Sequence, residues 1–148
     1  MLERARSVGH PREICQGWVT FRGLQSGRRF LANFRLPPEK GSPAVGWIWN
    51  DGERKPAAKT GLQFTSDSSA EGKEPVAPRT ISALDGSFHI TRGALLYRYS
   101  FIDELGPLLG GIVNLVVGNP ITNYYDAQVQ VSPDKPLIEG VLELMHIE

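Results

Sequence analysis

Hydrophobic and polar side chains alternate most regularly between Asn123 and Val131. The residues at every second position from Asn123 form a largely apolar face, and most of the residues between them are polar. Alternation with a period of two is typical of a strand that buries one face. A turn at 132–136, which contains two prolines, leads into a second alternating segment with Ile138, Leu142 and Leu144 on one face. The two segments predict a β-hairpin.

The same alternation predicts strands earlier in the chain. Trp18–Leu24 and Arg29–Leu36 flank a short link that contains Gly27, where a positive φ is cheap, and so predict another hairpin. In its second strand the apolar residues from Phe30 to Leu36 share one face. Further strands are predicted at 44–49, 61–65, 80–84, 87–92 and 95–99, with a kink or bulge at Gly93.

One segment carries a helical signal. Ser100 is followed three residues later by an acid, as in a capped first turn, but Gly106 and Pro107 come so soon afterwards that we expect at most one short helix. The apolar run 108–117 is expected to be flexible at first and then a strand buried on both faces or lining a pocket. About eight to ten short strands with hardly any helix favour an all-β antiparallel barrel or sandwich.

Length and charge limit the domain organisation and the partners. The 148 residues are the size of one domain, which we place at 14–148 behind an irregular arm at 1–13, with a polar surface loop at 66–75. The chain has sixteen acidic and sixteen basic side chains, so it has no net positive charge that would attract nucleic acid. We expect no membrane span and no secretion signal, because the sequence has no long apolar run and its start lacks the apolar core of such a signal. Its single cysteine, Cys15, excludes an internal disulfide, and we expect a cytoplasmic protein.

Three groups of residues resemble a known family. They are the hairpin that begins at Gly17–Phe21, the turn at 46–52, and the segments 124–127 and 139–144. Their order and spacing resemble the carotenoid-hydratase and lipocalin-like group, which includes hydroxyneurosporene synthase relatives and fungal Diels–Alderases. The resemblance implies an antiparallel lipocalin-like (calycin-type) β-barrel.

The resemblance also implies an apolar ligand. Members of the group carry two such barrels, with the ligand between or inside them, and this chain would match only the C-terminal one. It would then pair with another copy as a homodimer, have lost the activity, or keep only a pocket inside its own barrel. No catalytic residue can be transferred from the family.

Paired aromatic residues are the candidates for binding a small hydrophobic substrate. Trp47 and Trp49 lie two positions apart on one strand and could form an aromatic wall. Tyr97 and Tyr99 repeat the spacing, with hydroxyls that could orient a carbonyl, and Tyr124 is the fifth candidate. The alternative explanation for all of them is ordinary barrel core.

Candidate catalytic groups each have a structural alternative. His89 is a general acid or base if its strand face lines the barrel, and has no role if that face meets solvent. Asp103 could protonate an alkene, as could Glu104 or Asp126, if apolar surroundings raise its pKa; otherwise it belongs to a helix cap. Tyr97 is the third catalytic candidate, through its hydroxyl.

The sequence contains none of the common cofactor motifs. It has no phosphate-binding glycine loop with lysine, no nucleophile elbow, no zinc-protease motif and no dinucleotide fingerprint, so we expect neither a cofactor nor a metal. Our first expectation is a cofactor-free cyclase or isomerase, possibly a pericyclase, that shapes a polyene, polyketide or terpenoid intermediate in natural-product biosynthesis. The alternatives are a non-catalytic carrier of a small hydrophobic ligand, and a hydratase or lyase that uses an acidic residue.

Overall fold

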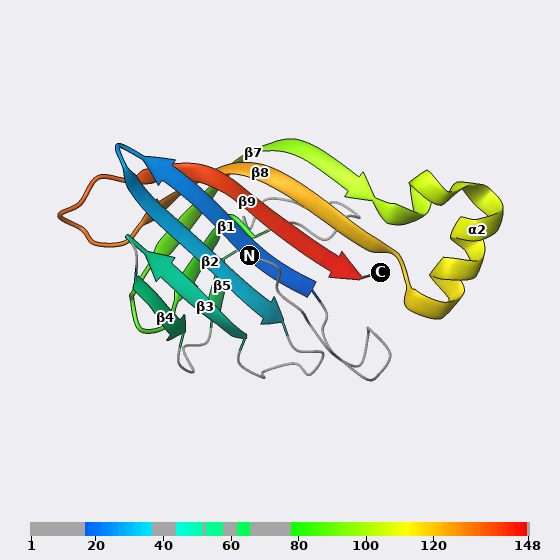
Figure 1. Ribbon diagram of the computed structural model, residues 1–148, viewed down its shortest axis with the longest axis horizontal. Helices are drawn as coiled ribbons and strands as arrows, with labels where there is room; N and C mark the ends of the chain where they lie inside the picture. Colours follow the sequence, from blue (N-terminus) through cyan, green and yellow to red (C-terminus); the bar gives the residue numbers. More distant parts are fainter. Residues whose placement is uncertain (1–16, 37–43, 52, 58–61, 66–77, 148) are drawn as a thin grey trace.

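A computed structural model describes residues 17–36, 44–51, 53–57, 62–65 and 78–147. The predicted arm at 1–13, the predicted loop at 66–75 and Cys15 lie outside these residues. Within the described residues, nine strands form one antiparallel sheet that curls into a lipocalin-like half-barrel, with one helix (Figure 1). The predicted all-β fold class is therefore confirmed.

The sheet runs from edge strand β4 through β3, β2, β1, β9, β8, β7 and β6 to edge strand β5. The strands are β1 (Gly17–Gln25), β2 (Arg28–Leu36), β3 (Val45–Asn50), β4 (Glu53–Ala57), β5 (Leu62–Thr65), β6 (Thr80–Ala83), β7 (His89–Ser100), β8 (Pro120–Gln130) and β9 (Ile138–Ile147). The two predicted hairpins meet at the centre, where β1 pairs with β9. Strand β4 has no counterpart among the predicted strands, and its Pro56 suits an edge strand because an edge need not supply every ladder donor.

Local turn chemistry explains the first hairpin. Ser26 and Gly27 both have positive φ, 51° and 79°, which is the conformation of a type I′ turn. This turn matches the right-handed twist of the flanking strands and sets the β1–β2 register, in which Phe21 lies opposite Ala32. The predicted shared face of β2 is confirmed, because Phe30, Ala32 and Phe34 are all buried.

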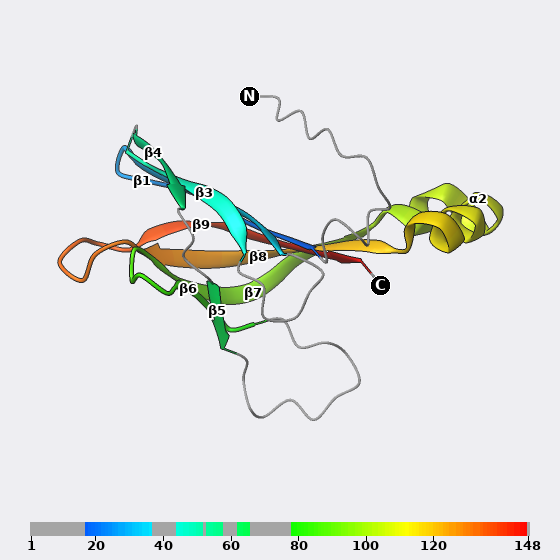
Figure 2. The same cartoon turned by 90° about the horizontal axis from the view of Figure 1, so that it is seen from below.

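The core lies inside the curl of the sheet. Phe88, just before β7, contacts Phe30 and Phe34 of β2 with ring centroids 5.7 Å apart in both pairs. These contacts join strands that lie four positions apart in the sheet, so the two ends of the sheet fold toward each other (Figure 2). We call the face that carries these rings the concave face and the opposite one the convex face.

The helix is longer than the sequence predicted. α2 (Phe101–Val117) begins at the predicted cap, where the Asp103 backbone N–H donates to the Ser100 hydroxyl over 3.4 Å. Gly106, at φ 74° and ψ 171°, interrupts the helical conformation where the sequence predicted an end, and a second helical segment follows. Pro107 then opens the second half, where its missing N–H costs no hydrogen bond. The strand expected within 108–117 was wrong.

Candidate functional site

Cross-strand pairing places a series of apolar rows on the concave face. One row runs from Leu144 through Val19 to Phe34, and the next contains Leu142, Phe21 and Ala32. Apart from Leu144, which is partly buried against this cluster, these side chains are at most 1 % exposed. The interior of the curl is therefore filled by phenylalanine rings and aliphatic side chains.

Apolar side chains remain accessible at the margins of this face. Leu95 of β7 pairs with the buried Tyr125 and is 53 % exposed, while Phe64 of β5 pairs with the buried Ile81 and is 41 % exposed. Leucine and phenylalanine in such positions offer contact area to an apolar molecule. The concave face therefore has a closed centre and an accessible apolar margin.

Polar groups stand at the end of the concave face nearest α2. Arg98 pairs with Asn123, and Asn123 in turn pairs with Leu144, so all three lie on the concave face. Arg98 is exposed and Asn123 is partly buried. A guanidinium and an amide beside an apolar surface can bind a carboxylate or a carbonyl oxygen.

A second arginine on this face has a structural role. The Arg92 guanidinium lies 4.8 Å from the ring centre of Tyr125, and its Nε donates to the Pro78 carbonyl over 3.0 Å. Its Nη1 donates to the Gly93 carbonyl over 3.3 Å. These contacts engage both the charge and the donors of Arg92.

The three tyrosines among the predicted binding residues come together, but on the convex face. Tyr97 pairs with Tyr124, and their ring centroids are 6.2 Å apart. The Tyr99 hydroxyl donates to the Glu104 carboxylate over 3.2 Å. Loss of water around this hydroxyl, followed by the negative charge of Glu104, raises the pKa of Tyr99. Tyr99 therefore keeps its proton and remains a hydrogen-bond donor to Glu104.

Two register shifts in β7 separate Leu95 from the tyrosines. The register shifts between Arg92 and Leu95 and again between Leu95 and Tyr97, which confirms the bulge predicted at Gly93 and adds a second one. Leu95 thus lies on the concave face and Tyr97 on the convex face, although uninterrupted alternation predicted one face for both. The two shifts cancel beyond Leu96, so Arg98, which sequence analysis did not select, lies on the same face as Ile90 and Arg92.

The two tryptophans also lie on the convex face, away from the tyrosines. Trp47 pairs with Asn33 and Trp49 with Leu31, whereas Ile48 between them packs against the core. Five strand spacings of about 4.8 Å separate β3 from β7, which is roughly 24 Å along the sheet. The five predicted binding residues therefore do not form one site.

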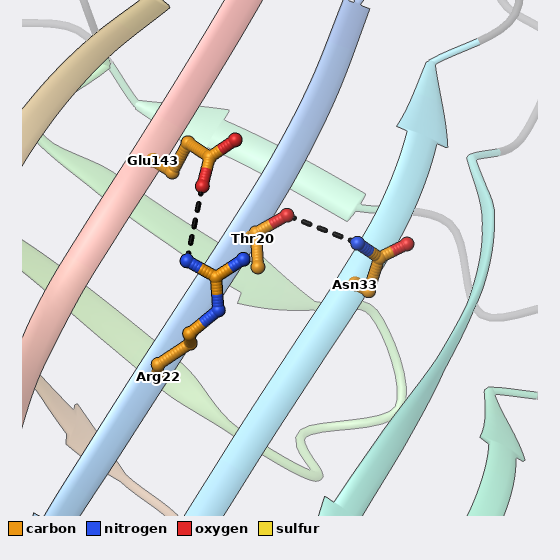
Figure 3. A network of polar contacts seen from close by, with 4 residues as sticks. All are labelled: Thr20, Arg22, Asn33 and Glu143. Atoms are coloured by element: carbon orange, nitrogen blue, oxygen red, sulfur yellow. Dashed lines mark hydrogen bonds and ion pairs between the residues drawn. The ribbon is translucent and has the colours of Figure 1, made fainter. Parts of the chain in front are cut away.

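Polar contacts cover the convex face between these two aromatic groups. The Asn33 side-chain amide donates to the Thr20 hydroxyl over 3.0 Å, and Arg22 pairs with Glu143 over 3.1 Å (Figure 3). Thr20 is only 5 % exposed, so its hydroxyl needs this partner. These contacts stabilise the central strands, which lie between the tryptophans and the tyrosines.

Trp49 lines an open, largely polar cleft of about 530 Å³ at the β1–β2 and β3–β4 turns. Two of its charged groups, Arg28 and Asp51, have partners within the protein. Asp51 accepts from the Arg29 backbone N–H over 2.9 Å and lies 3.7 Å from Arg28 Nε, while Arg28 Nη1 donates to the Pro136 carbonyl over 3.1 Å. The remaining nitrogen of Arg28 is buried, so a molecule in the cleft cannot reach it.

The candidate acids and bases lie away from the concave face. His89 is exposed, with Nδ1 2.6 Å from the Ser82 hydroxyl, so the solvent-facing alternative describes it. Asp103 is exposed in the first turn of α2, and Asp126 is exposed on the convex face. The structure does not bring His89, Asp103 and Tyr97 together.

The part of the chain that the structure describes contains neither a cluster of metal ligands nor a helix that could span a membrane. No three or more histidine, cysteine, aspartate or glutamate side chains gather there in a way that could hold a metal ion. No helix in the same ranges is both long and apolar enough to cross a membrane.

Comparison with known proteins adds no family. Neither the family models nor the curated proteins searched match this sequence. The resemblance to the carotenoid-hydratase and lipocalin-like group therefore stays a prediction that rests on the sequence motifs alone.

Proposed function

We propose that the protein binds a small apolar ligand with one polar end, and that it carries this ligand without transforming it. The apolar body of the ligand would lie along the concave face, between the exposed Leu95 and the partly buried Leu144. Its carboxylate or carbonyl end would meet Arg98 and Asn123. The pairing of these two polar residues beside Leu144 on one sheet face is the observation that carries the proposal.

Binding is favoured over catalysis because the predicted acid and base groups lie elsewhere. A general acid must reach within hydrogen-bond distance of the atom that it protonates. His89 and Asp103 are both exposed and neither lies on the concave face. The cyclase or isomerase function stays a prediction, and the hydratase or lyase stays an alternative to it.

A conjugated tetraene fatty acid tests binding and catalysis together, because its fluorescence rises in an apolar site and its absorbance is lost if the polyene cyclises or is hydrated. We expect saturable fluorescence with unchanged absorbance. Arg98→Gln should weaken binding at least about tenfold, since a hydrogen bond to a charged group is worth roughly 1.5–3 kcal/mol. The methyl ester of the same acid keeps a carbonyl oxygen but no charge, so Arg98→Gln should weaken its binding less than that of the acid.

Arg35→Gln is the matched control, because Arg35 is an exposed arginine that pairs with Trp18 on the convex face. Circular dichroism and thermal unfolding should show that both variants fold like the wild type. Absence of saturable binding, or equal weakening by both substitutions, would refute the proposed site. Loss of the tetraene absorbance on incubation with the protein would restore the catalytic function.

A further inference from the structure

The second half of α2 exposes an unusual amount of apolar surface. We define residues 107–118, from Pro107 to Gly118, as the apolar lobe. Five of its large side chains are more than half exposed: Leu108 79 %, Leu109 57 %, Ile112 57 %, Leu115 88 % and Val116 56 %. The core aliphatic residues of the sheet, by contrast, are almost fully buried. Contiguous exposed apolar surface of this kind marks an interaction site.

These five side chains lie on one side of the helix. Positions 108, 112 and 115 recur at helical spacing, and 109 and 116 extend the same side, which gives a stripe roughly 120° wide. Figures 1 and 2 show that α2 extends beyond the end of the sheet, at the tip of the β7–β8 hairpin. The described strands therefore leave the five side chains of the stripe more than half exposed.

The charge of the lobe distinguishes a lipid surface from a protein groove. From Leu105 to Gly118 the sequence contains no charged residue, and Asn114 is the one residue with a polar side chain. Protein interfaces surround their apolar centre with a polar rim, which the lobe does not have. The charged residues that precede the lobe most closely in sequence are Asp103 and Glu104. Both are acidic and exposed, so they would repel anionic lipids. A neutral lobe behind two acids complements zwitterionic lipid.

Tyrosines stand where the lobe joins the sheet. Tyr97, Tyr99 and Tyr124 lie on the last part of β7 and the first part of β8, the two strands that lead into and out of α2. Tyr97 is 58 % exposed. Tyrosine rings are enriched where the apolar and polar layers of a membrane meet, because the ring is apolar and the hydroxyl is wet. We call these three residues the tyrosine collar. The lobe and the collar follow one another as a segment that inserts into lipid and an aromatic belt at the membrane interface do.

We infer that the apolar lobe inserts into one leaflet of a zwitterionic lipid membrane and holds the protein at the membrane surface. The helix lies in one leaflet without crossing the bilayer, with Leu108 and Leu115 among the acyl chains and the tyrosine collar at the headgroups. The inference does not depend on the ligand proposed above, and it would stand if the concave face bound nothing.

The experiment is flotation of the purified chain with phosphatidylcholine vesicles, comparing wild type with the double variant Leu108→Gln, Leu115→Gln. Both leucines are highly exposed, so the substitutions leave the core intact. We expect the wild type to float with the vesicles and the double variant to lose at least tenfold in partitioning. Leu24→Gln with Leu84→Gln is the matched control, because these leucines are 63 % and 66 % exposed at other places, and it should float like the wild type.

Two further measurements distinguish zwitterionic lipid from other possible partners of the lobe. Raising the salt concentration should not weaken binding, and adding anionic lipid should not strengthen it, since the lobe is uncharged. In Leu115→Trp the new tryptophan should shift its emission to the blue when vesicles are added. Failure of the wild type to float, or binding that needs anionic lipid and disappears in salt, would overturn the inference. So would a lipid-free dimer in sedimentation velocity that the double variant alone converts to monomer, because the stripe would then be covered by a second copy.

Discussion

Replacing Phe88 tests whether contacts across the curl hold the half-barrel together. The ring is 2 % exposed and touches Phe30 and Phe34 from the far side of the sheet. Phe88→Ala removes both contacts and leaves a cavity between strands that share no backbone hydrogen bonds. Burial and cavity terms together predict a loss of about 3–5 kcal/mol in the free energy of unfolding. For a chain of this length that lowers the Tm by roughly 10 °C.

Urea unfolding followed by tryptophan fluorescence measures this loss, with the denaturant slope expected to stay unchanged. Phe101→Ala is the matched control: its ring is 41 % exposed at the start of α2, so it should cost less than about 1 kcal/mol. A double-mutant cycle of Phe30 and Phe88 should give a coupling of about 0.5–1.5 kcal/mol. Equal losses for Phe88→Ala and Phe101→Ala would refute the claim that the ring contacts fix the curl.

Two other predictions concern a glycine and a tyrosine. Gly140→Ala should lower the free energy of unfolding by about 1–3 kcal/mol, because the new Cβ would meet the backbone of Arg22 in a central strand pair. Gly111→Ala meets nothing within 4 Å in a helix and should stabilise the protein by up to about 1 kcal/mol; chemical denaturation of both variants decides whether backbone crowding is the cause. The raised pKa of Tyr99 means that its contribution to stability is present below pH 10 and is lost as the pH rises through the folded-state pKa. In an ultraviolet titration Glu104→Gln should move that pKa back toward 10.0, and an unchanged pKa would contradict the assigned partner.

The side chains of the candidate site were harder to predict than the strands, because the register of β7 shifts twice. Each extra residue in a strand moves every later side chain to the opposite face of the sheet. Gly93 signalled the first shift in β7, but the second, beside Leu96, has no comparable signal in the sequence. Arg98 and Tyr97 therefore could not be assigned to faces by counting, although both strand partners of β7 were predicted.

The sequence by itself determined the all-β class, most of the strand ranges, both central hairpins and the buried positions of β2, β8 and β9. These features follow from local alternation and turn residues, which act over a few neighbours. The tertiary structure alone decided which face Trp47 and the tyrosine cluster occupy, and that the curl is filled by phenylalanine rings. It also decided that α2 continues past Gly106 to Val117. Faces depend on the sum of register shifts, and packing depends on residues such as Phe30 and Phe88 that meet only when distant strands fold together.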